Sequence, residues 1–247
     1  MTEDMHSELP DTGERIIPAR ETEVSIVFAR HRCAYQYADN FVSGKTVIDI
    51  GCGTGYGCSL LAHKATRVVG IDQDANAIAY CREQYPGSNI EYREADAAAL
   101  DIAETFDVAT SFQVIEHLPD PSKFLVRIKR CVKPGGMILI TTPNSRTGST
   151  GVADNPFHTS EMNYIEFSEV IRQSFREFKI LGVGYASKNR YREFLIRSPL
   201  YRLGRLLKRG SALKKLAAGA MRMTEFRVSE QHVAEEAIDL LALCTNS

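Results

Sequence analysis

The sequence predicts an α/β fold in which a mostly parallel, doubly wound, seven-stranded sheet carries helices on both faces. Strand-like apolar runs alternate with helical patterns, and the runs lie near residues 46–50, 67–71, 90–93, 106–112, 136–142, 178–183 and 237–244. The first run ends in a turn with four closely spaced glycines. Repeated strand–helix units imply parallel pairing through right-handed crossovers. Such sheets bind their ligands at the carboxyl ends of the strands.

Length and composition favour one domain. The chain has 247 residues, of which 44% are hydrophobic, and a formal net charge of -1. We expect residues 1–13 to be disordered and residues 14–247 to form a single domain with a sizeable core. No apolar run of membrane-spanning length occurs, and the acidic N-terminus lacks the features of a secretion signal. The six cysteines show no C-x-x-C spacing, which favours reduced thiols in a cytoplasmic protein.

The first elements surround the glycine-rich turn. Apolar residues at helical spacing predict a helix from about Glu21 to Phe41, whose Tyr35 and Tyr37 could either cover a ligand or pack on the core. A buried strand follows and carries Asp49. Its turn contains Gly51, Gly53, Gly55 and Gly57, and a helix near 56–64 comes next. Glycines there let a ligand approach the main chain closely.

Asp72 supplies the second part of a nucleotide site. It ends the second strand and lies 21 residues after Gly51, where a carboxylate would bind both hydroxyls of a ribose. A hydride-transfer cofactor and S-adenosylmethionine both fit this layout. The dinucleotide pattern requires a third glycine where this chain has Tyr56. The turn therefore favours S-adenosylmethionine, which has no pyrophosphate to bind.

The remaining elements follow the same alternation. Helices are predicted near 74–85, 122–132 and 164–174. Ser122, just after Pro121, is the expected N-cap of the helix at 122–132. The run Lys133-Pro-Gly-Gly is the expected turn between that helix and the next strand.

These motifs together resemble one family. The turn from Asp49 to Gly55, Asp72, Asp96, the run Phe112 to Pro121 and Lys133 to Gly136 resemble the class I S-adenosylmethionine-dependent methyltransferases, which have a Rossmann-like fold. The likeness is greatest to bacterial small-molecule and glycan O-methyltransferases of the ubiquinone-methyltransferase type. It covers about residues 13–182 and the last strand, and it indicates the superfamily rather than the substrate.

The resemblance implies a role for each matching residue. Cofactor-binding residues would be Asp49, Gly51, Gly53, Gly55, Asp72, Asp96, Ala97, Gln113, Ile115 and Tyr35. The glycines would pass under the methionine part of S-adenosyl-L-methionine, and Asp72 would hold the ribose. Asp96 would receive the adenine amino group beside the Ala97 amide. Gln113 would face the methionine amino group, and Ile115 would press on the adenosyl group or form the pocket floor.

Two histidines are candidate catalytic bases. His117 follows the fourth strand, and His158 lies in Asn155-Pro-Phe-His158 after the fifth. A histidine near neutral pKa suits the removal of a proton from a hydroxyl nucleophile. Each could instead be structural, in the pocket wall or in loop ordering. Glu116 and both histidines could also hold Mg²⁺, but related metal sites begin with an acid where this chain has Gln113, so no metal is expected.

Residues 186–228 depart from the minimal fold. They contain twelve basic residues and two acids, for a net +10, so the rest of the chain carries -11. Leucines and alanines at helical spacing lie between the charges, which predicts a basic helical insertion before the last strand. It could be a lid, a peripheral membrane contact through 199–223, or a contact with an anionic substrate or oligomer partner.

The sequence therefore predicts an O-methyltransferase acting on a hydroxyl of a sugar or other small polar metabolite. Methylation of a quinone precursor or other phenol is one alternative, and a non-catalytic S-adenosylmethionine-binding module is another. Nucleic acid is not expected as a partner, because no basic stripe accompanies the acidic core.

Overall fold

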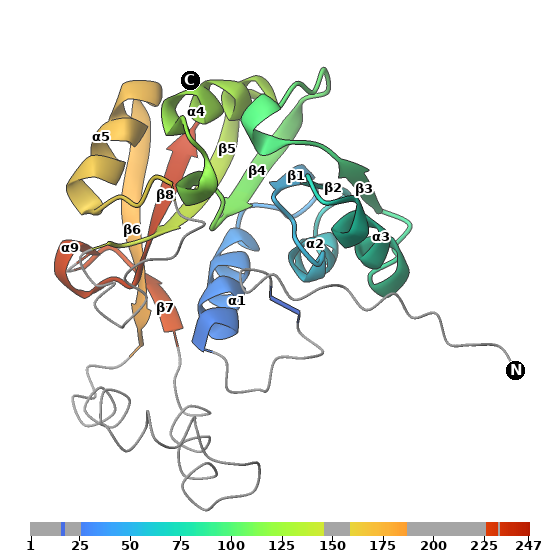
Figure 1. Ribbon diagram of the computed structural model, residues 1–247, viewed down its shortest axis with the longest axis horizontal. Helices are drawn as coiled ribbons and strands as arrows, with labels where there is room; N and C mark the ends of the chain where they lie inside the picture. Colours follow the sequence, from blue (N-terminus) through green and yellow to red (C-terminus); the bar gives the residue numbers. More distant parts are fainter. Residues whose placement is uncertain (1–15, 18–25, 146–158, 187–225, 232) are drawn as a thin grey trace, which may run out of the picture.

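Eight strands form one sheet in the order β3-β2-β1-β4-β5-β8-β6-β7 (Figure 1). The structure is a computed structural model that describes residues 16–17, 26–145, 159–186, 226–231 and 233–247. The strands are β1 Thr46–Ile50, β2 Arg67–Asp72, β3 Ile90–Glu94, β4 Phe106–Phe112, β5 Val132–Pro143, β6 Glu177–Tyr185, β7 Phe226–Ser229 and β8 Asp239–Thr245. The α-helices are α1 Ile26–Ala38, α2 Tyr56–Ala62, α3 Ala75–Gln84, α4 Pro121–Arg130, α5 Tyr164–Ser174 and α9 Val233–Glu236.

Strands β1 to β5 run parallel, so their carboxyl ends share one rim of the sheet, which we call the carboxyl rim. Strand β8 runs antiparallel to both β5 and β6, and β7 runs antiparallel to β6. Strand β6 is therefore parallel to β5, and Tyr185 at its end lies at the carboxyl rim. The predicted doubly wound α/β architecture is confirmed.

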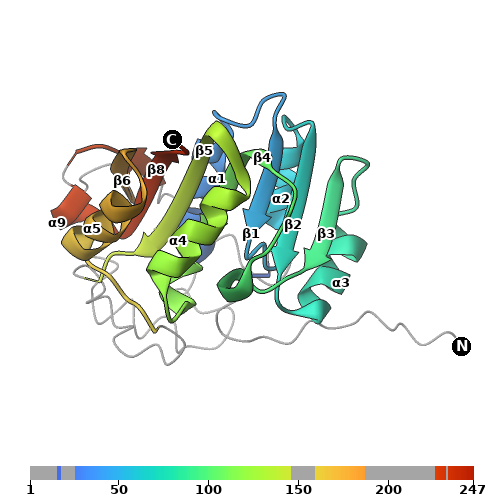
Figure 2. The same cartoon turned by 90° about the horizontal axis from the view of Figure 1, so that it is seen from above.

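Alternation along the strands divides the core into two layers. Val47, Val68 and Val108 point to the face covered by α1, α2 and α3. Ile48 and Val69 point to the opposite face, which α4 and α5 cover through apolar residues such as Phe124 and Phe167 (Figure 2). Because strand side chains alternate between faces, a sheet covered on both sides reads as the continuous apolar runs seen in the sequence.

Several details differ from the sequence-based expectations. The sheet has eight strands rather than seven, because Phe226–Ser229 forms an edge strand on β6. The last residues of the expected helical insertion at 186–228 are therefore β-structure, and residues 187–225 lie outside the described part. The N-cap of α4 is Asp120, whose side chain accepts the Lys123 amide at 2.9 Å, and not Ser122. Proline fits the first helical turn, where its missing N–H has no intrahelical partner.

Strand β5 begins earlier than expected. Val132 already pairs with Phe106, and a register shift between Phe106 and Val108 lets Lys133 to Gly136 continue the strand. Gly135 takes φ +77°, which accommodates the irregularity. All six cysteines are free and buried, in agreement with the expected thiols. In the described ranges, no helix has the length and apolar character needed to cross a bilayer.

Candidate functional site

The glycine-rich turn after β1 is fixed to the neighbouring strand by its backbone. The Gly51 and Cys52 amides both donate to the carbonyl of Ile71, each at 2.8 Å. Gly51, Gly53 and Gly55 take positive φ values of 74°, 56° and 79°. A residue with a Cβ rarely adopts this backbone conformation, so the turn depends on glycine at these positions.

One side of the turn is packed and the other is open. A Cβ on Gly51 would lie 2.4 Å from the Val114 side chain, and one on Gly55 would lie 2.7 Å from the Cys81 sulfur. A Cβ on Gly53 would meet no atom within 4 Å among the described residues. The turn therefore rests on the protein at Gly51 and Gly55 and presents bare backbone to open space at Gly53. A ligand that passes along the main chain fits that arrangement.

Asp72 lies directly beside this open backbone. Its carboxylate accepts the Gly53 amide at 2.9 Å and the Asp74 amide at 3.0 Å. A carboxylate offers about four acceptor positions, so two remain for hydroxyl groups of a ligand. The structure thus brings the predicted glycines and the predicted ribose acid together at the carboxyl rim.

Asp96 and Ala97 lie at the end of the next strand. The Ala95 amide donates to the Asp72 carbonyl at 2.9 Å, which holds this segment beside the turn. Asp96 is exposed, and its side chain accepts the Ala98 amide at 2.8 Å as the cap of the short 3₁₀ helix Ala97–Ala99. The carboxylate is anchored at one oxygen and open at its surface, as an adenine contact requires. That contact stays a prediction.

Gln113 is held in an unusual conformation after β4. With φ 57° it is the one non-glycine residue of positive φ in the described part of the chain. Its backbone amide donates to the Thr141 carbonyl at 3.1 Å, and its side-chain amide donates to the Thr141 hydroxyl at 3.1 Å. Strained backbone of this kind is found disproportionately at functional sites.

Ile115 is a core residue, which corrects the expected contact with the adenosyl group. Its side chain has no exposed surface and belongs to the cluster beneath α4. The residue before it, Val114, packs against Gly51 instead. The sequence interpretation missed Val114, because in a 3₁₀ turn neighbouring side chains point in different directions that a strand or helix period does not predict.

His117 ends the 3₁₀ helix Ile115–His117 and is half-buried at the carboxyl rim. The preceding carbonyl, that of Glu116, accepts the amides of Thr159 and Ser160 at 2.9 Å each. Residue 159 therefore lies against the segment that carries His117. The other predicted base, His158, lies outside the described residues. His158 is also one of the three residues of the alternative Mg²⁺ set, so that set is not tested. The described residues contain no group of three His, Cys, Asp or Glu able to hold a metal.

Asp49 and Tyr35 lie beneath the turn, not in its open space. Asp49 has no exposed surface and Tyr35 has almost none, so neither side chain can touch a ligand without rearrangement. The Tyr35 hydroxyl donates to Asp49 at 3.0 Å, and the Thr110 hydroxyl donates at 2.6 Å. Burial raises the pKa of Asp49 to about 6, although these hydrogen bonds lower it. The core-packing interpretation of Tyr35 is favoured over that of a cover.

The structure also shows a contact with the turn that the sequence interpretation did not assign. The Thr54 hydroxyl donates to the Ile16 carbonyl at 2.8 Å, and Ile16 and Ile17 are both buried. Residues 16–17 therefore lie on the turn although α1 separates them from it in sequence. The adjacent isoleucines within a polar stretch are the signal that could have indicated this docking.

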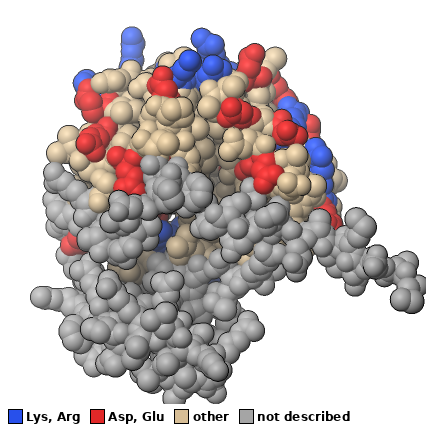
Figure 3. All heavy atoms as spheres, in the orientation of Figure 1, with Lys and Arg blue, Asp and Glu red and all other residues tan. Residues whose placement is uncertain are grey.

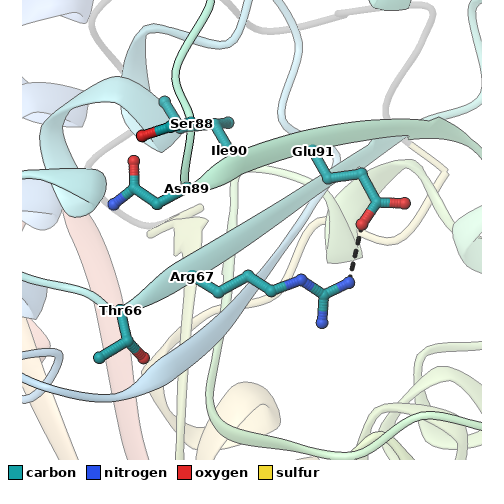
Figure 4. Close-up of a pocket in the computed structure, with 6 residues that line it drawn as sticks. All are labelled: Thr66, Arg67, Ser88, Asn89, Ile90 and Glu91. Atoms are coloured by element: carbon teal, nitrogen blue, oxygen red, sulfur yellow. Dashed lines mark hydrogen bonds and ion pairs between the residues drawn. The ribbon is translucent and has the colours of Figure 1, made fainter.

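A hollow of about 200 Å³ lies elsewhere, at the amino ends of β2 and β3. Thr66, Arg67, Ser88, Asn89, Ile90 and Glu91 line it (Figure 4). The Arg67 guanidinium forms ion pairs with Glu91 at 2.7 Å and with Glu104, so its charge is already matched. This hollow is on the rim opposite the glycine turn, and none of the predicted site residues lies there.

Comparisons with known proteins agree with the geometry at the carboxyl rim. A family model described as "Methyltransferase domain" matches residues 48–140. A protein of Mycolicibacterium smegmatis named "Probable S-adenosylmethionine-dependent methyltransferase" is 40% identical over 181 residues, which are 72% of this chain and 69% of that protein.

Two further similarities are more distant or shorter. A "Ubiquinone biosynthesis O-methyltransferase" of Pseudomonas fluorescens is 39% identical over 107 residues, covering 42% of this chain and 46% of that protein. This chain thus matches less than half the length of the Pseudomonas relative. The solved structure of an S-adenosylmethionine-dependent methyltransferase from Mesorhizobium loti matches with a TM-score of 0.56 and 17% identity. It covers 87% of this chain and 99% of that one, and it supports the fold alone.

Proposed function

Because this chain belongs to the S-adenosylmethionine-dependent methyltransferases, we propose that it transfers a methyl group to a hydroxyl of a sugar or other small polar metabolite. The observation that carries the cofactor assignment is the open backbone at Gly53 beside the Asp72 carboxylate. The proposal for the acceptor rests on the two histidines after the fourth and fifth strands, which suit the deprotonation of a hydroxyl.

The chemistry of the residues at the carboxyl rim supports the cofactor assignment. The bare backbone at Gly53 would lie along its methionine part, Asp72 would accept the ribose hydroxyls, and Asp96 would accept the adenine amino group. The cofactor supplies a methyl group that is already activated by the sulfonium. The protein must then align the acceptor hydroxyl with that methyl group, exclude water, and remove one proton. The position of His117 after β4, at the same rim, supports it as the group for the last task.

Replacing His117 should separate catalysis from cofactor binding. We expect His117→Ala to lower kcat by roughly 10²- to 10⁴-fold, the range for loss of a general base, with an unchanged affinity for S-adenosylhomocysteine. His158→Ala tests the other candidate. The matched control is His63→Ala, because His63 is exposed at the end of α2, on the opposite rim. Transfer of tritiated methyl groups to a polar-metabolite extract and to a phenol panel measures the effect, and wild-type turnover by both variants would exclude a histidine base.

A phenol or quinone precursor is the second candidate acceptor. The match to the Pseudomonas protein named for ubiquinone biosynthesis favours it, although that name describes only the relative. The same tritium assay distinguishes the two, since label would appear in the phenol panel and not in the polar extract. Tight cofactor binding without transfer to any acceptor would instead favour a non-catalytic binding module.

The basic segment also has a place in this proposal. The chain leaves the sheet at Tyr185 and returns at Phe226, whose rings lie 5.1 Å apart at the carboxyl rim. Both ends of the segment therefore lie at the rim that carries the proposed site. On the face shown in Figure 3, Lys and Arg alternate with Asp and Glu, without a patch of one sign. We propose that residues 199–223 contact an anionic membrane surface, while the remaining protein stays in the reducing cytoplasm.

Co-sedimentation with vesicles tests the membrane contact. The full chain should pellet with vesicles rich in phosphatidylserine and much less with phosphatidylcholine, because each basic residue near an anionic surface contributes about 1 kcal/mol. Deletion of residues 199–223 should remove the difference, and binding of S-adenosylhomocysteine by the deletion variant confirms that it is folded. Equal pelleting of both proteins would exclude the contact and favour a lid or an anionic-acceptor role for the segment.

A further inference from the structure

A carboxylate that forms no ion pair within the described residues lies under the glycine-rich turn. Asp49 is fully buried at the end of β1, two residues before Gly51. Its hydrogen bonds come from neutral groups on three elements: Tyr35 on α1 at 3.0 Å, Thr110 on β4 at 2.6 Å, and Cys58 on α2 at 3.4 Å. In the described ranges no Lys, Arg or His forms an ion pair with it.

Tyr35 is held in place from three sides. Its ring packs edge-on against Phe112 at 4.8 Å and against Tyr56 at 5.5 Å between centroids. The same ring packs closely on α2 at Gly57, where a Cβ would lie 2.0 Å from a Tyr35 ring carbon. The hydroxyl is therefore aimed at Asp49 by packing that is independent of the hydrogen bond. It is the one donor to Asp49 that the N-terminal helix supplies.

The charge on Asp49 depends on these donors. Burial, with a smaller contribution from the nearby Asp72 carboxylate, raises its pKa to about 6, although the hydrogen bonds from Thr110, Tyr35 and Cys58 lower it. Cys58 on α2 and Tyr35 on α1 both have raised pKa values, so each donates as a neutral group near neutral pH. A hydrogen bond to a carboxylate favours its charged form. Loss of the Tyr35 hydroxyl should therefore favour the protonated acid.

We propose that Tyr35 is a positioning residue that keeps Asp49 ionised beneath the turn, so that helix α1 controls how tightly the cationic cofactor is held. The inference rests on the proposed function, since it assumes that S-adenosylmethionine occupies the turn. A negative charge in a water-poor interior attracts a positive ligand more strongly than the same charge in solvent. Tyr35 thereby acts on the cofactor through Asp49 and need not touch it.

Calorimetric titration with S-adenosylmethionine between pH 5.5 and 8.5 tests this role. The affinity of the wild-type protein should fall as pH decreases through the titration of Asp49. In Tyr35→Phe, which retains the packed ring, the midpoint should move up by roughly one pH unit, the shift expected for losing one hydrogen bond to a charged group. Its affinity should be about fivefold below wild type at pH 6 and within twofold at pH 8.5, as follows from that shift.

Two further variants make the result decisive. Tyr37→Phe makes the same change two residues along α1, where the ring packs against Phe41, and should leave the profile unchanged. Asp49→Asn should remove the midpoint. An unshifted midpoint in Tyr35→Phe, an equal loss of affinity at both pH values, or a midpoint that survives Asp49→Asn would overturn the inference. If wild type itself shows no binding heat, the proposed function fails instead.

Discussion

Asp72→Ala should lower the affinity for S-adenosylhomocysteine by about 100-fold or more, because each hydrogen bond to a charged acceptor contributes about 1.5–3 kcal/mol and 1.4 kcal/mol is tenfold. Two such bonds, to the ribose hydroxyls, are assigned to this carboxylate. The side chain also accepts the Gly53 amide, so its loss frees the turn as well. Isothermal titration calorimetry on the purified variant measures the change.

The ribose contact can be separated from the support of the turn. Wild type should bind adenosine more tightly than 2′,3′-dideoxyadenosine, and Asp72→Ala should lose that difference. Asp74→Ala is the matched control two residues away, since Asp74 caps α3 by accepting the Asn76 amide at 2.8 Å. It should cost about 1 kcal/mol of stability, as N-cap losses do, with little change in affinity. Affinity within threefold of wild type in Asp72→Ala would show that the ribose assignment is wrong.

Gly55→Ala should have the largest effect on folding. At φ +79° an alanine costs about 1–2 kcal/mol. Its Cβ would also lie 2.7 Å from the Cys81 sulfur and 3.1 Å from a Tyr92 ring carbon, and overpacking of this kind adds about 1–3 kcal/mol. We expect a loss of roughly 2–5 kcal/mol in the free energy of unfolding from these two terms, measured by urea denaturation without ligand.

Gly135→Ala isolates the backbone term. Gly135 has nearly the same φ, +77°, yet a Cβ there would meet nothing within 4 Å among the described residues. The Gly135→Ala variant should therefore lose only about 1–2 kcal/mol in the free energy of unfolding, the cost of an alanine in the left-handed conformation. Equal losses in the two variants would mean that the contacts with Cys81 and Tyr92 relax without cost. The packing that supports the turn would then be looser than the structure indicates.

The sequence predicted the site best where chemistry and spacing act locally. The glycines of the turn and Asp72 have the predicted conformations and proximity, because positive φ requires glycine and because parallel strands align their ends. Buried placement was harder to predict. Asp49, Tyr35 and Ile115 lie in the correct segments, yet all three are covered, since coverage depends on which distant elements pack on them. The docking of Ile16 on Thr54 is of the same kind, because the adjacent isoleucines indicate burial but not the element that covers them.

The strand order was predictable only in part for the same reason. The alternation of strand-like and helical patterns predicted the parallel half of the sheet, because successive parallel strands are joined by crossover connections. The short strand Phe226–Ser229 pairs with β6 across a long segment, and nothing in four residues specifies such a partner. The basic character of the segment between β6 and β7 was visible in the sequence. That it leaves the sheet at the carboxyl rim was not, because the direction of β6 depends on its antiparallel pairing with β8.

The position of β8 also has a consequence for biosynthesis. This strand, at residues 239–245, lies between β5 and β6, so β5 and β6 are joined only through it. During vectorial synthesis, β6 leaves the ribosome well before the strand that links it to the parallel half. The facing edges of β5 and β6 therefore stay unpaired in the nascent chain until β8 emerges, and such edges are sites of aggregation. Correct assembly of the sheet consequently waits until β8 has been translated.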